Sequence, residues 1–542
     1  MARRNPVKPS ALDNLIAVFS PKRAAQRLAW RTQYAALGGG YKGARRDRRA
    51  TYGLNRDEGS ADSQILPDLP DLRAASQELV RNFPLATGAL NTKVTSVIGS
   101  GLRVRSEVDA EYLGLDDDQK ESIETELERV FNRWAGSVEC DLTRVQTFNE
   151  IQDLVYRAEK ESGDVLILKR FVERAGSAFG FKLQIVEGGR LVNPGHAADT
   201  LEIAGGIRFD SYGAPSAYCI ANVSAPSDLF VSAKDIVEVP AFDAAGRANV
   251  IHLFQRRRPG QSRGVPDFAP VIEMLKQLGD YTDGELTAAV VSSFLTVFVT
   301  SEDGGGLDAM EPASETGAKG SDKDFKLGAG ALLDLQPGEK IETVNPGRPN
   351  DKFDPFVLAV LRQIGVALEL PFEILIKHFT ASYSASRAAL LEAWKYFRRE
   401  RTRFAARFCQ PVYEEVIAEA VARRFIVLPG FNDPAVREAY LGAVWHGPGM
   451  MSLDPLRENK AYEVDENRGW KTAAEITAEK TGNDWDRNIR RRGKEQAKRR
   501  ELGLTGEVIA ERIQSEPKEE AVSESAVAVA SEGGDAETED LA

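Results

Sequence analysis

The sequence predicts an α+β fold, and two patterns indicate it. Runs rich in β-branched and aromatic residues follow one another between residues 163 and 243, without the helical segments that would connect parallel strands. Apolar residues at helical spacing dominate the chain before and after these runs. The 542 residues, 42% of them hydrophobic and 28% charged, are enough for a soluble protein of two to four domains.

Before the β-rich runs, the sequence predicts several helices. Two helical periods separated by Pro84 occupy residues 70–101, and amphipathic helices are expected over 116–135 and 148–162. Three consecutive aspartates open the helix at 116–135. A metal site is one interpretation of them, but acidic residues in a first turn favour the helix dipole, and we prefer that explanation.

The pattern changes after residue 264. About thirty residues of helical character run into a β-branched strand at 295–300, and a Gly, Ser, Asp and Lys-rich loop follows over 301–330. A strand, a turn and a second strand come next, and then a helix that continues to Pro371. One small β-containing insert is therefore expected between two helices.

The longest predicted helix covers residues 386–424. At 1.5 Å per residue it would be about 60 Å long, which is more than a usual domain diameter. Because one compact domain cannot cover such a helix, we expect it to pack against copies of itself or against several neighbours. Its apolar positions at helical spacing include Leu390, Trp394, Phe397, Phe404 and Phe408.

Charge is distributed unevenly along the chain. Residues 1–50 carry twelve Lys or Arg and two Asp, a net charge of +10, and a second basic run spans 487–500. Such runs indicate either phosphate binding or a solvated face, and we favour the solvated face. Residues 515–542 hold nine acidic residues and one lysine, and this composition predicts disorder.

Several classes of protein are excluded by what the sequence lacks. It has no run of about 18 apolar residues, and the apolar stretch 15–19 is shorter than the roughly 7–15 residues of a signal peptide, so we expect a cytoplasmic protein. Phosphate-binding-loop, H-E-x-x-H, C-x-x-C and G-x-S-x-G motifs are absent. We therefore predict no enzyme, cofactor or metal. Cys140, Cys219 and Cys409 are dispersed, and we predict that they are buried.

Six segments, in order, resemble the portal proteins of tailed bacteriophages of the lambda type. They include SYSASRAALLEAWKYFRRE at 382–400 and GGIRFDSYGAPSAY at 205–218, and the others are 72–102, 252–286, 335–375 and 445–484. The resemblance covers residues 72–504. No single motif decides it, but the ordered set is specific.

The resemblance implies a portal fold with a wing, a helical stem, a small β-containing clip, a long spine helix and a helical crown. Its implied boundaries are a basic, partly disordered N-terminal arm at 1–71, the wing at 72–263, stem helices at 264–293 and 353–374, the clip at 294–352, a tunnel loop at 375–384, the spine helix at 385–424, the crown at 425–514, and a disordered acidic tail at 515–542.

Portal proteins form rings, typically of twelve subunits, at one capsid vertex, and double-stranded DNA is packaged and ejected through the central channel. The resemblance implies the same here, without sequence specificity for DNA. The implied partners are the terminase large subunit, a head–tail adaptor, and the major capsid and scaffold proteins, with no membrane. The implied location is the virion, and the host cytoplasm during assembly.

The resemblance also assigns site residues. The tunnel loop would present Lys377, His378, Phe379, Thr380, Ser382 and Tyr383 to DNA. For Phe379 and Tyr383, packing against a neighbouring loop is as good an explanation. Arg387 would bind a phosphate or pair with an acidic neighbour, and the apolar positions of the spine helix would pack between subunits.

Two other classes remain open from the sequence. The basic runs also suit a nucleic-acid enzyme such as a nuclease or terminase subunit. A capsid scaffold or minor head protein without a channel is the second alternative.

Overall fold

The computed structural model describes residues 10–36, 49–54, 58–222, 236–293, 297–301, 339–343, 353–379, 382–450, 455–482 and 485–502. Most of the predicted clip, including its long loop, and the whole acidic tail lie outside these residues. The chain divides into two compact units, Met1–Ser60 and Ala61–Ala542.

The first unit contains two helices where the sequence predicts a partly disordered basic arm. Helix α1 spans Ala11–Phe19 and helix α2 spans Pro21–Ala36, followed by a short 3-10 turn at Arg49–Thr51. Ser10 and Asp13 cap α1 reciprocally, and Asp13 also pairs with Arg27 at 2.9 Å and with Arg31. This one buried carboxylate therefore joins the two helices.

The second unit begins with the predicted helices. They are α3 Ala61–Ile65, α4 Leu69–Asn82, α5 Pro84–Val97, α6 Ala110–Leu113, α7 Asp117–Ala135 and α8 Phe148–Ser162. Pro84 opens α5, where a missing N–H costs nothing. Asp116 caps α7 and exchanges hydrogen bonds with Gln119, so the first of the three aspartates begins the helix, as we preferred.

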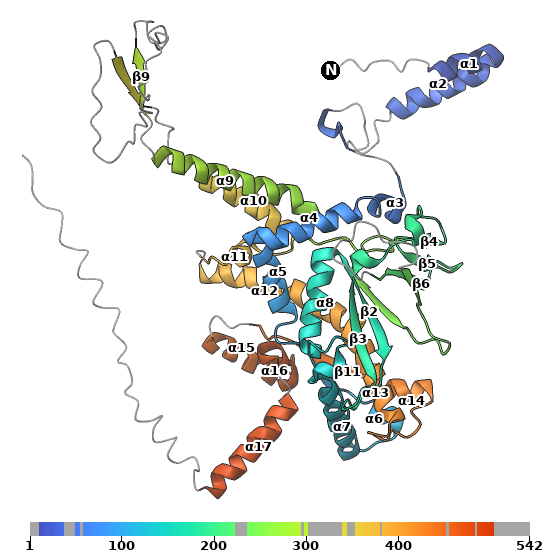
Figure 1. The fold of residues 1–542 in the computed structure, drawn as a ribbon, viewed down its shortest axis with the longest axis vertical. Coiled ribbons are helices and arrows are strands. Elements are labelled where there is room, and N and C mark those ends of the chain that lie inside the picture. The colour runs from blue at the N-terminus through green and yellow to red at the C-terminus, as the bar shows by residue number, and fades with distance from the viewer. Residues whose placement is uncertain are drawn as a thin grey trace, which may run out of the picture. The chain divides into compact units, whose positions relative to one another are not determined.

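Two antiparallel sheets follow, as the hairpin-like sequence pattern predicts. The first has the order β3–β2–β8, and the second has the order β4–β5–β6–β7. Helix α8 packs on β2 and β3 (Figure 1). The strands are β2 Asp164–Phe171, β3 Phe181–Glu187, β4 Ile203–Ala204, β5 Ile207–Phe209, β6 Pro215–Ala221, β7 Ile236–Pro240 and β8 Val250–Phe254.

The region after the sheets contains two adjacent helices. Helix α9 spans Ile272–Ser293 and helix α10 spans Phe353–Ala367, and they lie side by side (Figure 1). Between them in the chain, β9 Val297–Ser301 pairs antiparallel with β10 Glu339–Thr343. Helix α9 begins later than the predicted residue 264, and α10 ends before the predicted residue 374, because Glu369 adopts a left-handed conformation with φ of 56°.

The long helix is present and contains one irregular turn. Helix α12 spans Tyr383–Phe404, a π-helical turn covers Ala405–Cys409, and helix α13 spans Gln410–Ala422. Pro411 lies in the first turn of α13, directly after the π-helical turn. Such a turn accommodates the backbone carbonyls that a proline leaves without a donor.

The C-terminal region is not purely helical, which corrects the prediction for the crown. Its helices are α14 Pro434–Leu441, α15 Pro455–Asn467, α16 Ala473–Thr481 and α17 Trp485–Glu501. Strand β11, Ala443–His446, pairs antiparallel with β1, Arg103–Ser106. This four-residue strand is too short to give a period in the sequence, and it joins the predicted crown to the predicted wing.

An aromatic core lies where the long helix meets α7 and α8. Phe131 contacts Phe148 edge-on at 5.6 Å and Tyr413 at 5.3 Å between ring centroids. Phe404 and Phe408 are fully buried in the same core. The three cysteines are also buried, as predicted. Among the described helices, none combines the length and apolar character that crossing a membrane requires.

Candidate functional site

The candidate site is the short segment between α10 and α12. Helix α11, Phe372–Leu375, packs on α5 through the buried side chains of Ile374 and Leu375. Lys377 ends this helical turn in a left-handed conformation, with φ of 55°, and the His378 N–H then donates to the Glu373 carbonyl at 3.1 Å. The segment is thus fixed at its start by apolar burial and by a helix-ending turn.

Three predicted site residues are exposed together on this segment. Lys377, His378 and Phe379 follow one another, and Phe379 is 51% exposed. Ser382 is exposed too, and its hydroxyl accepts the Ala385 N–H at 3.4 Å, which begins α12. A cation, an imidazole, an aromatic ring and a capping hydroxyl are thus exposed within six residues of the chain.

The structure describes the other predicted site residues only in part. Thr380 lies outside the described residues, and only the backbone of Tyr383, at the start of α12, is described. Arg387 lies one turn further along α12 and is half-buried. Its predicted role, in phosphate binding or in an ion pair, stays a prediction.

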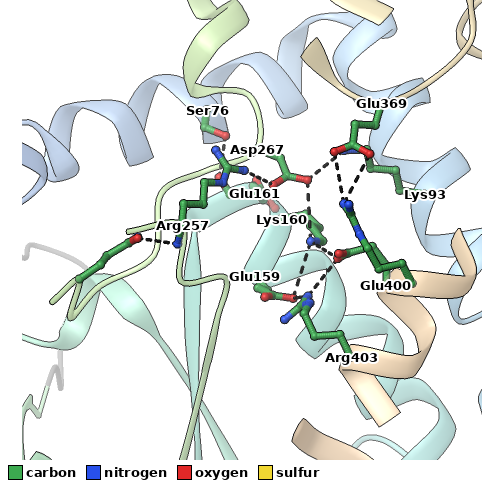
Figure 2. A network of polar contacts seen from close by, with 12 residues as sticks. Ser76, Lys93, Glu159, Lys160, Glu161, Arg257, Asp267, Glu369, Glu400 and Arg403 are labelled. Atoms are coloured by element: carbon green, nitrogen blue, oxygen red, sulfur yellow. Dashed lines mark hydrogen bonds and ion pairs between the residues drawn. The ribbon is translucent and has the colours of Figure 1, made fainter. Parts of the chain in front are cut away.

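The same unit contains a group of buried charges that no sequence pattern indicated. We call it the joint cluster, and Figure 2 shows how its side chains converge from four parts of the chain. Helix α8 contributes Glu159 and Lys160, α12 contributes Glu400 and Arg403, α5 contributes Lys93, and the loop before α9 contributes Asp267.

Lys160 is the central cation of the joint cluster. Its Nζ lies 2.6 Å from Glu400 Oε2 and 3.9 Å from Asp267 Oδ2, and its side chain is only 2% exposed. Lys93 Nζ reaches the same Asp267 oxygen at 2.9 Å. Arg403 Nη2 bridges Glu159 at 2.7 Å and Glu400 at 3.0 Å. Three cations thus face three carboxylates, and all six side chains are at most 20% exposed.

Ion pairing within the joint cluster outweighs burial in setting the pKa values of its central groups. Burial alone would raise the pKa of the Asp267 carboxyl, but Lys160 and Lys93 outweigh it and hold that pKa well below its usual range. Burial likewise opposes the charge on Lys160, but the surrounding carboxylates raise the pKa of this lysine above its ordinary value. Asp267 and Lys160 are therefore charged at neutral pH, and the cluster fixes α12 to α8 and to the beginning of α9.

The comparisons with known proteins identify the family. The family model for the phage portal protein, lambda family, matches residues 47–401. The chain belongs to the lambda family of phage portal proteins. Its function is that of a portal protein of a bacteriophage virion.

Two curated portal proteins are similar over most of their length. The portal protein of Escherichia phage N15 is 26% identical over 492 residues, which cover 87% of this chain and 91% of the relative. Portal protein B of Escherichia phage lambda is 24% identical over 493 residues, with the same coverage.

Similar solved structures come from a gene transfer agent particle. One is the virion of the native particle, with a TM-score of 0.39 and 12% identity, and it covers 76% of this chain and 92% of that chain. Another is the neck of the native particle computed with C12 symmetry, with a TM-score of 0.40, 11% identity and the same coverage.

The predicted subunit-packing residues of this portal chain separate into two groups. Phe397, Phe404 and Phe408 are 4%, 0% and 0% exposed, because they lie in the chain's own hydrophobic core, where Phe404 and Phe408 contact aromatic rings of α8. Their side chains belong to the chain's own core, and we no longer assign them to a subunit contact. Leu390 and Trp394 are half-buried at its edge, and for them the prediction stays.

A second buried charge centre organises the sheets of the portal chain. Asp164, at the beginning of β2, accepts hydrogen bonds from Arg263 and, at 3.2 Å, from Arg73, and its Oδ2 lies 3.3 Å from His252 Nε2. Arg263 also donates to the carbonyls of Gly188 and Gly205. The centre joins both sheets to α4, and nothing in its geometry points to chemistry.

Proposed function

We propose that this chain forms a ring around a channel for double-stranded DNA at a capsid vertex, with residues 375–384 facing the DNA. Family membership carries the proposal, and the exposure of Lys377, His378 and Phe379 supports the choice of this segment as the DNA-facing surface. Twelve subunits is the number expected for the family. The location would be the virion, reached by assembly in the host cytoplasm.

The proposed contact with DNA is passive and independent of sequence. Lys377 can meet any phosphate, since every nucleotide carries the same charge, whereas contacts to base edges would hold one sequence in place. His378 adds a polar group beside it. ATP hydrolysis would belong to a separate terminase that docks on the clip, residues 294–352. The other proposed partners are the head–tail adaptor and the capsid and scaffold proteins.

The stem helices offer apolar surface for neighbouring subunits. Leu286 on α9 is 64% exposed, and Phe356 and Val366 on α10 are 54% and 81% exposed. Exposed apolar side chains in adjacent helices are typical of surfaces that another protein covers. We therefore assign the main contact between subunits to α9 and α10, together with the edge of α12 at Leu390 and Trp394.

The proposal is tested by the assembly state of the purified protein. Mass photometry combined with negative-stain imaging should show closed rings of about twelve copies of the 59.4 kDa chain around an open centre. A strict monomer or dimer that persists at high concentration and with scaffold protein added contradicts the proposal. A solid or open assembly would instead favour a scaffold without a channel.

A further inference from the structure

We propose that helix α17 of the crown binds the phosphate backbone of duplex DNA. This inference deepens the proposed function, because it adds a second DNA contact far along the chain from residues 375–384. It rests on the charge, the exposure and the anchoring of this helix.

The charge of α17 is dense and entirely exposed. The helix covers Trp485–Glu501 and contains no buried residue. Every residue from Arg487 to Leu502 is exposed. The helix has three acidic residues, and its eight basic residues are Arg487, Arg490, Arg491, Arg492, Lys494, Lys498, Arg499 and Arg500.

The helix is anchored at its beginning and projects from there. Asp486 pairs with Arg105 of strand β1, and Arg490 Nη1 lies 2.6 Å from Glu121 Oε1 on α7. Further along, Arg491 pairs within the helix with Glu495 at 3.5 Å. Arg492, Lys494, Lys498 and Arg499 form no ion pair with the part of the chain that the structure describes.

The spacing of these charges destabilises the helix unless a partner neutralises them. Arg490 and Lys494 are four residues apart, as are Lys494 and Lys498, so like charges lie one above the other on the helix. Side chains at that spacing repel each other and weaken the helix. A dense polyanion would remove this repulsion, whereas solvent only screens it.

The chemistry of the helix favours a nucleic acid over a protein partner. Arg492 and Arg499 are seven residues apart, about 10 Å along the helix axis, and Lys494 and Lys498 lie between them. Duplex DNA carries one negative charge per about 1.7 Å of its axis, so several phosphates are within reach of this span. Protein interfaces have an apolar centre, but Ile489 is the one large apolar residue between Arg487 and Arg500.

The acidic segment 515–542 of the same chain is the competing occupant. It has a net charge of −8 and begins thirteen residues after Leu502. Duplex DNA is favoured because its phosphates are regularly spaced and because six of the eight cations are arginines, whose planar guanidinium groups pair with phosphate in bidentate geometry.

The experiment compares two full-length variants with equal loss of charge. The test variant combines Arg492→Gln, Lys494→Gln, Lys498→Gln and Arg499→Gln. The control variant removes four exposed cations from other helices: Arg81→Gln, Arg129→Gln, Lys276→Gln and Lys395→Gln. Binding of a short fluorescent duplex is followed by anisotropy at salt concentrations between about 50 and 200 mM.

We expect the test variant to bind the duplex at least about tenfold more weakly, with a shallower salt dependence, because fewer counterions are released. The control variant should bind within about twofold of the unmodified chain, since it keeps α17. Equal affinity of the test variant and the unmodified chain overturns the inference, and it is also the result expected if the acidic segment occupies α17.

Mass photometry of the same samples separates this inference from the proposed function. Rings in both variants, with weaker DNA binding only in the test variant, support both proposals. Absence of rings in every sample contradicts the proposed function, while the anisotropy comparison still decides the role of α17.

Discussion

At the scale of single residues, a substitution of Lys160 tests most directly whether the joint cluster stabilises the fold. We predict that Lys160→Met lowers the free energy of unfolding by about 3–5 kcal/mol, because it leaves the Glu400 and Asp267 carboxylates buried without their shared cation. Methionine keeps most of the length of the side chain, so loss of charge is the main change. Urea unfolding of the purified protein measures the difference.

A matched control exists on α12. Lys395 pairs with Glu392, and both side chains are exposed, by 74% and 69%. Lys395→Met should therefore change the free energy of unfolding by less than about 1 kcal/mol. Similar losses in the two variants would show that the joint cluster does not hold these elements together.

His252 should make the stability of the protein depend on pH. Burial of its ring lowers its pKa below the ordinary value, although Asp164 opposes this shift. Below about pH 6.5 the unfolded chain then binds a proton that the folded chain does not, so stability falls as the pH decreases. Asp164, Asp267 and Glu400, whose pKa values are lowered in the fold, lose their contributions at still lower pH, below about 4.

We predict that His252→Gln flattens the part of this profile near pH 6. The readout is the midpoint of thermal unfolding measured between about pH 5 and 8, where ordinary carboxylates stay ionised. The quantity to compare is the slope of the unfolding midpoint against pH. The absolute midpoint is not compared, since glutamine also changes the hydrogen bond to Asp164. An unchanged slope would assign the effect to another group.

Lys377 allows backbone strain and charge to be tested separately. Its φ of 55° is unfavourable for a residue with a side chain, so Lys377→Gly should stabilise the turn by up to about 1 kcal/mol, whereas Lys377→Gln should not. Both changes remove the charge, and both should alter DNA packaging in assembled particles if the cation meets phosphates. Normal packaging in both variants would place the DNA contact elsewhere.

At the scale of elements, helices α9 and α10 carry the proposed subunit contact. Leu286→Lys combined with Val366→Lys should reduce ring formation, because charged groups would have to be buried between subunits. Leu201, which is 99% exposed in a loop of the sheet region, provides the control Leu201→Lys. Mass photometry counts the subunits, and intact rings in the double variant would exclude this surface from the contact.

Helix positions were predictable because local signals define them. Pro84 divides α4 from α5, and helix α8 lies at the predicted residues 148–162, where Thr147 and Glu150 form a capping box before an amphipathic pattern. Strand β11 was missed because four residues show no period, and its pairing with β1 spans more than three hundred positions of the sequence.

The joint cluster could not be predicted for a different reason. Its members extend from Lys93 to Arg403, and a single charged residue in a sequence is normally assigned to the surface. Only the fold brings the six charges together. The same limit explains Phe404 and Phe408. The length of the helix indicated contacts beyond the chain, but the sequence did not show that α8 packs on this part of it.

At the scale of the whole molecule, the division into two units leads to a prediction about the N-terminal region. Residues Met1–Ser60 form their own unit, in which Asp13 ties α1 to α2, while both buried charge centres belong to Ala61–Ala542. Removal of residues 1–60 should therefore leave the thermal midpoint within about 2 °C of that of the full chain, since the joint cluster and the Asp164 centre keep the partners described above.

The same truncation tests which part of the chain makes the ring. If α9, α10 and the edge of α12 carry the subunit contact, then the truncated chain should form rings with the same number of subunits as the full chain, as counted by mass photometry. The charge-preserving control is the full chain carrying Leu12→Ser and Leu15→Ser, which changes exposed apolar residues of α1 without removing the unit. Loss of rings in both samples would move the assembly contact to α1, whereas loss in the truncated chain alone would indicate a role for the basic charge of residues 1–50.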